Sequence, residues 1–226
     1  MEAIILAGGF GTRLQSVVSD VPKPMAPING KPFLEYILLY LKKYGINKVV
    51  LAVSYKKDII KDYFKDYFYG INIIYSEENE PLGTGGAIKE ALKNIDSHNV
   101  YVLNGDTYFD IDLRKMKLNK NKIQISLKLM HNFDRYGSVI IDNDGSILEF
   151  CEKEYKKVGL INGGIYLIRR DLFNDFNAKE VFLFEDFIKN NVRKLNVSSV
   201  VFDDYFIDIG IPSDYKQACC DFIKLF

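Results

Sequence analysis

The residues best suited to chemistry come at the start of the chain, where a short apolar run ends in a glycine-rich segment. Ala3 to Ala7 is apolar and rich in β-branched residues, which predicts a buried central strand. It stops at Gly8-Gly9-Phe10-Gly11, followed by Thr12 and Arg13. Open α/β sheets bind ligands at such a strand end, and glycines let backbone N–H groups approach phosphate oxygens closely. An arginine adds paired donors for phosphate, so this segment predicts a phosphate-binding loop.

A second cation, Lys23, follows in a stretch that three prolines hold rigid. Two familiar phosphate loops do not fit the first segment. The dinucleotide fingerprint needs a third glycine where Leu14 stands, and a P-loop needs Gly-Lys-Ser/Thr, whereas the one Gly-Lys pair, Gly30-Lys31, precedes Pro32. By itself the segment is also compatible with an ordinary glycine turn.

Two aspartates are candidate magnesium ligands. Asp106 follows the apolar run Tyr101-Val102-Leu103, at the strand end that faces the same crevice as the glycine loop. Asp208 lies between apolar neighbours, where a carboxylate is costly unless it is paired, capped or bound to metal. Magnesium takes few protein oxygens beside phosphates and water, so two aspartates suffice. The alternative for both residues is a role in a turn, because glycines stand beside them.

These motifs together resemble a known family. The run LAGGFGTRL, followed by PKPM and GKPFLEY, is similar to the signature of the sugar-1-phosphate nucleotidyltransferases, which join a sugar 1-phosphate to a nucleoside triphosphate and release pyrophosphate. Within the family, the sequence most resembles the D-glycero-D-manno-heptose 1-phosphate guanylyltransferases. The resemblance implies an α/β fold that is Rossmann-like, with a mostly parallel central sheet, helices on both faces and a small β-rich sugar-binding elaboration.

The resemblance also implies catalytic roles. LNGDTYF matches a metal-binding segment through Asp106, and FIDIGIPSDY matches the second one through Asp208, although Ile211 replaces the family's threonine. Mg²⁺ on these two aspartates would bridge the substrates. Arg13 and the loop amides would hold the β- and γ-phosphates, and Lys23 would neutralise charge in the transition state.

For the nucleotide, PLGTGGA resembles the family segment PLGTAGA, which lines the nucleobase pocket. Thr84 as an N-cap is the structural alternative. Glu80 is our candidate for guanine recognition, because a carboxylate can accept hydrogen bonds from both guanine N1–H and N2–H. Glu77 and Glu78 compete for this role, and an exposed loop glutamate is the other interpretation of Glu80. The expected nucleotide-binding residues are Leu6, Ala7, Gly8, Gly9, Gly11, Thr12, Arg13, Glu80, Pro81, Gly83 and Thr84.

Three further segments resemble the family's sugar site. Gly137 would contact sugar hydroxyls through its backbone, and Asn162, in a run similar to Asn-Ala-Gly-Ile-Tyr, would bind the sugar. Glu152-Lys153 resembles Glu-Lys-Pro, where the lysine meets the sugar phosphate and the glutamate a hydroxyl. Glu154 replaces the proline, which leaves the register of this loop open. Individually, a surface Glu-Lys pair and an Asn-Gly turn would explain these residues without a ligand.

Composition excludes several classes of function. In 226 residues, 30 basic and 30 acidic side chains cancel, so no global field recruits nucleic acid or an anionic membrane. We find no signal peptide and no apolar run of membrane-spanning length. Three cysteines with neither disulfide-framework nor zinc spacing indicate reduced thiols and a cytoplasmic location. The aromatic content leaves room for a homodimer.

The predicted elements form one domain, 1–226, with a mainly nucleotide-binding half (1–110) and a mainly sugar-binding half (111–226). In the first half strands alternate with helices, which predicts a doubly wound parallel sheet. After Asp110 strands dominate, and Gly164 to Ile168 is expected to return to the main sheet. The predicted strands are 3–7, 48–53, 71–75, 99–103, 122–130, 138–142, 146–150 and 164–168, and the predicted helices are 33–41, 58–68, 85–92, 183–192 and 212–225.

The resulting hypothesis is transfer of a nucleoside monophosphate, from GTP by preference, to D-glycero-D-manno-heptose 1-phosphate for surface polysaccharide synthesis. The nucleophilic phosphate oxygen is already anionic, so no general base is required. The alternatives are uridylyl or thymidylyl transfer, mannose-1-phosphate guanylyltransfer, and a non-catalytic nucleotide-sugar sensor.

Overall fold

Four parallel strands form the centre of the fold. The computed structural model describes residues 1–9, 14 and 17–226. Its largest sheet contains the parallel sequence β7–β1–β4–β6, formed by β7 (Asn99–Asn104), β1 (Glu2–Leu6), β4 (Lys48–Val53) and β6 (Ile71–Glu77). The strands β1, β4 and β7 are each an almost wholly buried and mostly apolar run, as expected for a parallel sheet covered on both faces.

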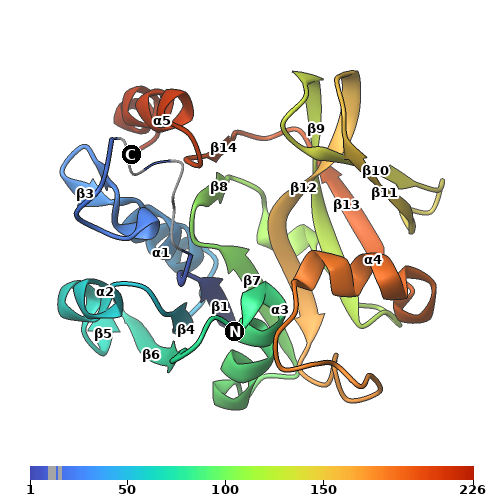
Figure 1. Cartoon of the computed structure of the whole chain (residues 1–226), viewed down its shortest axis with the longest axis horizontal. Helices are drawn as coiled ribbons and strands as arrows, with labels where there is room; N and C mark the ends of the chain where they lie inside the picture. The colour runs from blue at the N-terminus through green and yellow to red at the C-terminus, as the bar shows by residue number, and fades with distance from the viewer. Residues whose placement is uncertain (10–13, 15–16) are drawn as a thin grey trace.

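Helices cover both faces of these strands (Figure 1). Side chains alternate along each strand, so Ile5 and Leu51 pack on one face while Ile4 and Val50 pack on the other. The first face is covered by α1 (Phe33–Lys43), α2 (Lys57–Phe64) and α5 (Pro212–Leu225). The second face is covered by α3 (Gly83–Ala91) and α4 (Phe184–Leu195). The expected α/β class, a mostly parallel sheet with helices on both faces, is therefore confirmed.

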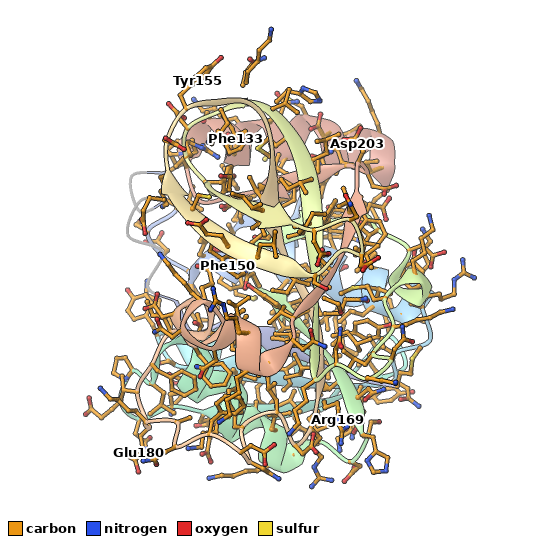
Figure 2. All side chains as sticks on the ribbon, turned by 90° about the vertical axis from the view of Figure 1, so that its right-hand side faces the viewer. Phe133, Phe150, Tyr155, Arg169, Glu180 and Asp203 are labelled. Carbon is orange, nitrogen blue, oxygen red and sulfur yellow. The ribbon has the colours of Figure 1, made fainter. Side chains whose placement is uncertain are left out.

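The β-rich elaboration is built on one long strand. β12 (Lys156–Arg169) pairs antiparallel with β7 at its carboxyl end, which confirms the expected return to the main sheet. Its other pairings are with β9 (Ile123–Phe133) and β10 (Gly137–Ile141), and β10 in turn pairs with β11 (Ile147–Lys153). Figure 2 looks onto this part and shows Tyr155 at the tip between β11 and β12. The elaboration therefore shares one continuous sheet with the parallel core.

The remaining elements are short and join the larger ones. A two-stranded sheet pairs β8 (Thr107–Phe109) with β14 (Phe206–Asp208), and another pairs β2 (Pro27–Ile28) with β3 (Lys31–Pro32). One-turn 3₁₀ helices occupy η2 (Lys23–Met25), η3 (Leu92–Asn94) and η4 (Leu113–Lys115). In the part of the chain that the structure describes, no helix combines the length and apolar character needed to cross a membrane.

Two expectations about the elements were wrong or incomplete. The predicted helix 58–68 ends at Phe64, because Lys65 has a positive φ of 52°, and Tyr67–Phe68 then forms β5, antiparallel to β6. The strand β13 (Ser198–Phe202), parallel to β9, was not predicted. Its sequence, SSVVF, has only three apolar residues, and of its five residues only Phe202 is buried.

A buried ionic anchor fixes the start of β1. The Glu2 carboxylate is 5% exposed and accepts hydrogen bonds from the backbone N–H groups of Asp96 (2.9 Å) and Ser97 (2.5 Å). Lys48 of the neighbouring strand lies 2.9 Å from it. Burial by itself raises the pKa of Glu2, but these donors outweigh it and lower the pKa to about 2.

Glu2 should therefore make folding stability depend on pH. A carboxyl with a lowered pKa in the folded state stabilises it above the ordinary value of 4.5, and this contribution is lost as pH falls from about 4.5 toward 2. At 1.36 kcal/mol per pKa unit it amounts to at most about 3 kcal/mol. We expect Glu2→Gln to lower the free energy of unfolding at pH 7 and to flatten its dependence between pH 5 and 3, measured by urea denaturation. An unchanged slope in the variant would contradict the anchor.

The last helix is held by an aromatic cluster. Phe222 is 1% exposed, and its ring contacts Phe33, Tyr36 and Tyr108 at centroid distances of 5.7, 4.8 and 5.3 Å. Rings in such a cluster bury large apolar areas in edge-to-face or offset geometry. This cluster joins α5, which follows Asp208, to α1 and β8.

Truncating Phe222 tests how much this cluster stabilises the fold. We expect Phe222→Ala to reduce the free energy of unfolding by about 3–5 kcal/mol, because it removes a buried ring and leaves a cavity. Ile223, its 71% exposed neighbour on the same helix, is the matched control, and Ile223→Ala should change stability by less than about 0.5 kcal/mol. Equal losses in chemical denaturation would show that the helix is not held through this face.

Candidate active site

Three charged side chains from distant parts of the chain meet at one point. Asp106 follows β7 directly, and Asp208 ends β14 opposite Thr107 in the β8–β14 pairing, which brings the two carboxylates together. Lys23 lies at the start of η2, and its Nζ is 2.5 Å from Asp106 Oδ2 and 3.5 Å from Asp208 Oδ1. The Lys23 side chain is only 10% exposed. The structure thus places together three of the four predicted catalytic residues; the fourth, Arg13, lies outside the described residues.

The electrostatics of this cluster favour a further cation. Burial, and next the negative charge of Asp106, raise the pKa of Asp208. The Lys23 ammonium and the Gly210 N–H, which donates to Asp208 Oδ1 at 2.6 Å, act in the opposite direction. Two carboxylates that share one lysine carry a net negative charge when both are ionised. An additional cation would therefore stabilise the ionised pair.

A cavity of about 620 Å³ opens on one side of the cluster. Its lining includes six of the predicted nucleotide-binding residues: Leu6, Gly8, Gly9, Pro81, Gly83 and Thr84. Ala7 does not line it, because this residue is fully buried and its N–H donates to the Ala52 carbonyl at 2.8 Å. The predicted Gly11, Thr12 and Arg13 lie outside the described residues. The strand ends and the start of α3 thus form one concave surface, as the topology of parallel strands requires.

Thr84 does not cap its own helix. Leu82 is the N-cap residue of α3, and its N–H donates to Glu78 Oε2 at 3.0 Å. Thr84 Oγ1 instead accepts from the backbone N–H of Phe184, the first residue of α4, at 2.8 Å. The hydroxyl therefore satisfies a free donor of a helix one hundred residues away, which local sequence cannot reveal.

The acidic residues before α3 divide between the cavity and solvent. Glu80 is exposed and is not among the described residues that line the cavity. Glu78 lines it and is half-buried, and this burial raises the pKa of Glu78 while the Leu82 N–H opposes the rise. Glu77 forms ion pairs with Lys57 and Lys61 at 2.8 and 2.6 Å. Of the three competing glutamates, Glu78 alone is placed to meet a ligand in the cavity.

A second cavity, of about 320 Å³, opens on the other side of the cluster. All four predicted sugar-phosphate-binding residues, Gly137, Glu152, Lys153 and Asn162, line it together with Asp208. They come from β10, β11 and β12, which the pairing of these strands brings side by side. Glu152 forms an ion pair with Lys189 of α4 at 2.8 Å. Phe150, labelled in Figure 2, lines the same cavity from β11.

The two cavities adjoin. Glu185 and Gly210 line both, whereas Asp106 lines the first and Asp208 the second. Glu185 was not predicted as a site residue, and neither was Tyr166, which lines the first cavity although it is 2% exposed. Tyr166 lies in the run that begins at Asn162 and resembles the family's sugar site, whereas no sequence motif singled out Glu185. The arrangement can hold two ligands with their reacting groups at the cluster.

Among the described residues, no group of three or more His, Cys, Asp or Glu side chains is arranged to hold a metal ion. Asp106 and Asp208 are therefore a pair, and any metal held there would need oxygens from ligands or water.

Comparison with known proteins identifies the family. The profile of the family described as "Nucleotidyl transferase" matches residues 2–224. The D-glycero-alpha-D-manno-heptose 1-phosphate guanylyltransferase of Campylobacter jejuni is 62% identical over 95% of this chain and 97% of its own length. The protein of the same name from Aneurinibacillus thermoaerophilus is 49% identical, with 96% of each chain covered.

A solved structure agrees with these sequences. HddC from Yersinia pseudotuberculosis, crystallised in complex with GMP-PN, superposes with a TM-score of 0.86 at 40% identity and covers 98% of this chain and 99% of its own. The resemblance of the sequence motifs to the nucleotidyltransferases is thereby confirmed: this chain belongs to the nucleotidyl transferase family.

Proposed function

We propose that the protein transfers the GMP group of GTP to D-glycero-α-D-manno-heptose 1-phosphate and releases pyrophosphate. The observation that carries this proposal is the 62% identity to the Campylobacter jejuni enzyme of that name over 95% of the chain. Two adjoining cavities with a Lys-Asp-Asp cluster between them support a reaction that joins two phosphate-bearing substrates.

In the proposed reaction, an oxygen of the sugar phosphate attacks the α-phosphorus of GTP. The bond from this phosphorus to the bridging oxygen breaks, and pyrophosphate leaves with the electron pair. The nucleophile is anionic, so catalysis depends on positioning and on neutralising charge. Lys23 would act at the α-phosphate, because its ammonium lies where the two cavities meet. Arg13 and the glycine-loop amides would hold the β- and γ-phosphates.

Asp106 and Asp208 would hold Mg²⁺. Carboxylate oxygens are the hard ligands that this ion prefers, and the pair already accommodates the cationic Lys23 Nζ between them. The donor set therefore fits the ion. When bound, Mg²⁺ would supply positive charge that offsets the charge of the phosphates.

Guanine recognition is assigned to Glu78 instead of Glu80. The Glu78 carboxylate lines the first cavity, and one of its oxygens is held by the Leu82 N–H. This contact fixes the carboxylate and leaves its acceptor capacity for the N1–H and N2–H donors of guanine. Pro81, Gly83 and Thr84 would form the wall of the same base pocket.

The sugar phosphate would occupy the second cavity. Lys153 would meet its phosphate, since no ion pair within 4 Å engages this lysine among the described residues, whereas Glu152 is paired with Lys189. The backbone of Gly137 and the amide of Asn162 would contact hydroxyls. We also retain the division into a nucleotide half and a sugar half as a proposal, with the qualification that Phe184 and Gly210 of the second half line the first cavity.

A panel of substrates tests the proposed function. We would measure pyrophosphate release with Mg²⁺ for GTP, UTP, dTTP, CTP and ATP, each with the 1-phosphates of heptose, mannose, glucose and N-acetylmuramic acid. We expect turnover with GTP and the heptose phosphate to exceed every other pair. A different preferred pair would retain the mechanism and replace the substrates, and no turnover from folded protein would favour a sensor.

Removing one charge from the carboxylate pair should abolish most catalysis. We expect Asp106→Asn to lower kcat by at least roughly 10²–10³-fold, the range seen when a charge-stabilising group is lost, with the melting temperature little changed. Asp203→Asn is the matched control, because Asp203 is exposed and pairs with Lys128 at 2.6 Å outside both cavities. Near-normal turnover of Asp106→Asn would remove this residue from the proposed metal site.

The base reader can be identified with two variants. Glu78→Gln should lower kcat/KM for GTP by roughly 10–100-fold, the value of hydrogen bonds to a charged acceptor, and should reduce the preference for GTP over ITP, which lacks the 2-amino group. Glu80→Gln should change neither quantity more than about twofold. If Glu80→Gln lowered these quantities and Glu78→Gln did not, guanine recognition would return to Glu80, the candidate from the sequence.

A further inference from the structure

Among the residues that the structure describes, Glu185 is the one acidic residue that lines both cavities. It is the second residue of α4 and lines both cavities. Its helix begins with Phe184, whose N–H donates to Thr84 Oγ1 at 2.8 Å, so the first turn of α4 is tied to the nucleotide side. This contact fixes the backbone that carries Glu185 at the junction of the cavities.

The Asn162 amide is directed by Glu185. Both amide hydrogens of Asn162 are used within the protein: Nδ2 donates to Glu185 Oε1 at 2.9 Å and to the Tyr166 hydroxyl at 2.6 Å. The Gly164 N–H donates to Asn162 Oδ1 at 3.1 Å. Burial, and next the charge of Glu185, raise the pKa of Tyr166, so its hydroxyl remains protonated. Asn162 therefore has no free N–H to offer a ligand.

Where the two cavities meet, the protein offers a hydrogen-bond acceptor. Asn162 retains part of the capacity of Oδ1, and Glu185 retains Oε2, for which no hydrogen bond occurs among the described residues. Glu185 shares the first cavity with Asp106 and the second with Asp208, and its carboxylate would repel phosphate oxygens in either one. The two proposed substrates carry no cationic group, so the group on them that complements this carboxylate is a neutral donor, and a hydroxyl is the one a sugar offers.

The position of this hydroxyl follows from the chemistry of a sugar 1-phosphate. The phosphate on C1 must reach the charged cluster, so the hydroxyl nearest the junction is the one on C2. Glu152 is less suited to this group, because it lines the second cavity and an outer groove formed with Leu148 and Val192, away from the first cavity. Its carboxylate is also paired with Lys189.

We propose that Glu185 is a specificity-determining residue that accepts a hydrogen bond from the 2-hydroxyl of the sugar 1-phosphate and orients Asn162. The substrates are then sugar 1-phosphates with a free 2-hydroxyl. This inference rests on the proposed function and deepens it, since it names the part of the sugar that the junction reads.

The test compares two sugars in two enzymes. We would measure kcat and KM at saturating GTP for the best sugar 1-phosphate of the panel and for its 2-deoxy counterpart, in wild type and Glu185→Gln. Wild type should prefer the hydroxylated sugar by roughly 10–100-fold in kcat/KM, the range for a hydrogen bond to a charged group. In Glu185→Gln this preference should fall to within about threefold, while the KM for GTP stays unchanged.

Three variants separate a specific contact from a structural effect. Glu185→Asp, which keeps the charge, should retain part of the preference. Glu152→Gln should lower turnover of both sugars alike and keep the wild-type preference. Glu90→Gln, on the surface of α3 beside Lys93, should behave as wild type.

The outcomes are distinguishable. Wild-type turnover with the same 2-hydroxyl preference in Glu185→Gln would overturn this inference alone. A loss that appears in the KM for GTP and in the preference for GTP over 3′-deoxy-GTP would overturn it in favour of a ribose contact. An absence of wild-type turnover with every pair would overturn the proposed function, and this inference with it.

Discussion

The charged contact among Lys23, Asp106 and Asp208 is the constraint on which the rest of the structure depends. Two neighbouring carboxylates repel each other and burial increases this repulsion; burial, and next the charge of Asp106, raise the pKa of Asp208. The positive charge of Lys23 reduces the repulsion between the two carboxylates but cannot cancel both of their negative charges. The fold holds the arrangement with rigid neighbours: a proline-bounded 3₁₀ turn carries the lysine, and the β8–β14 pairing carries the aspartates. A site that favours an additional cation follows from this constraint.

The fold also couples the two cavities through α4. The segment before this helix packs against the glycine-rich start of α3, where a Cβ on Gly85 would lie 2.2 Å from the Phe182 ring. The Thr84 hydroxyl then satisfies the first N–H of α4. Lys189 of α4 also forms an ion pair with Glu152 of β11, so one helix borders both cavities. In the proposed reaction, an element that borders both cavities would limit the relative movement of the two substrates, as catalysis by positioning requires.

Much of the fold follows from local sequence patterns, and each element that was predicted wrongly or missed has an identifiable physical cause. The helix 212–225 and the strand 48–53 have the predicted bounds, and the helix predicted over 33–41 extends to Lys43, because apolar periodicity is strong in these segments. The helix after Lys57 ended early because Lys65 takes a left-handed conformation that periodicity does not encode. β13 was missed because its apolar run is only three residues long, and its place in the sheet depends on pairing with β9, a strand about seventy residues away.

The sequence by itself determined the parallel core, the glycine-rich strand end, the two aspartates and the four residues that line the second cavity. The parallel core follows from local apolar patterns, whereas the site residues were identified through the resemblance of short motifs to a known family. Tertiary structure alone decided that Glu78 instead of Glu80 faces the first cavity, that Thr84 serves α4 instead of α3, and that Glu185 stands between the cavities. The physical reason is that the direction of a polar side chain near a loop depends on what packs against it. Here the packing partners come from chain segments about one hundred residues away.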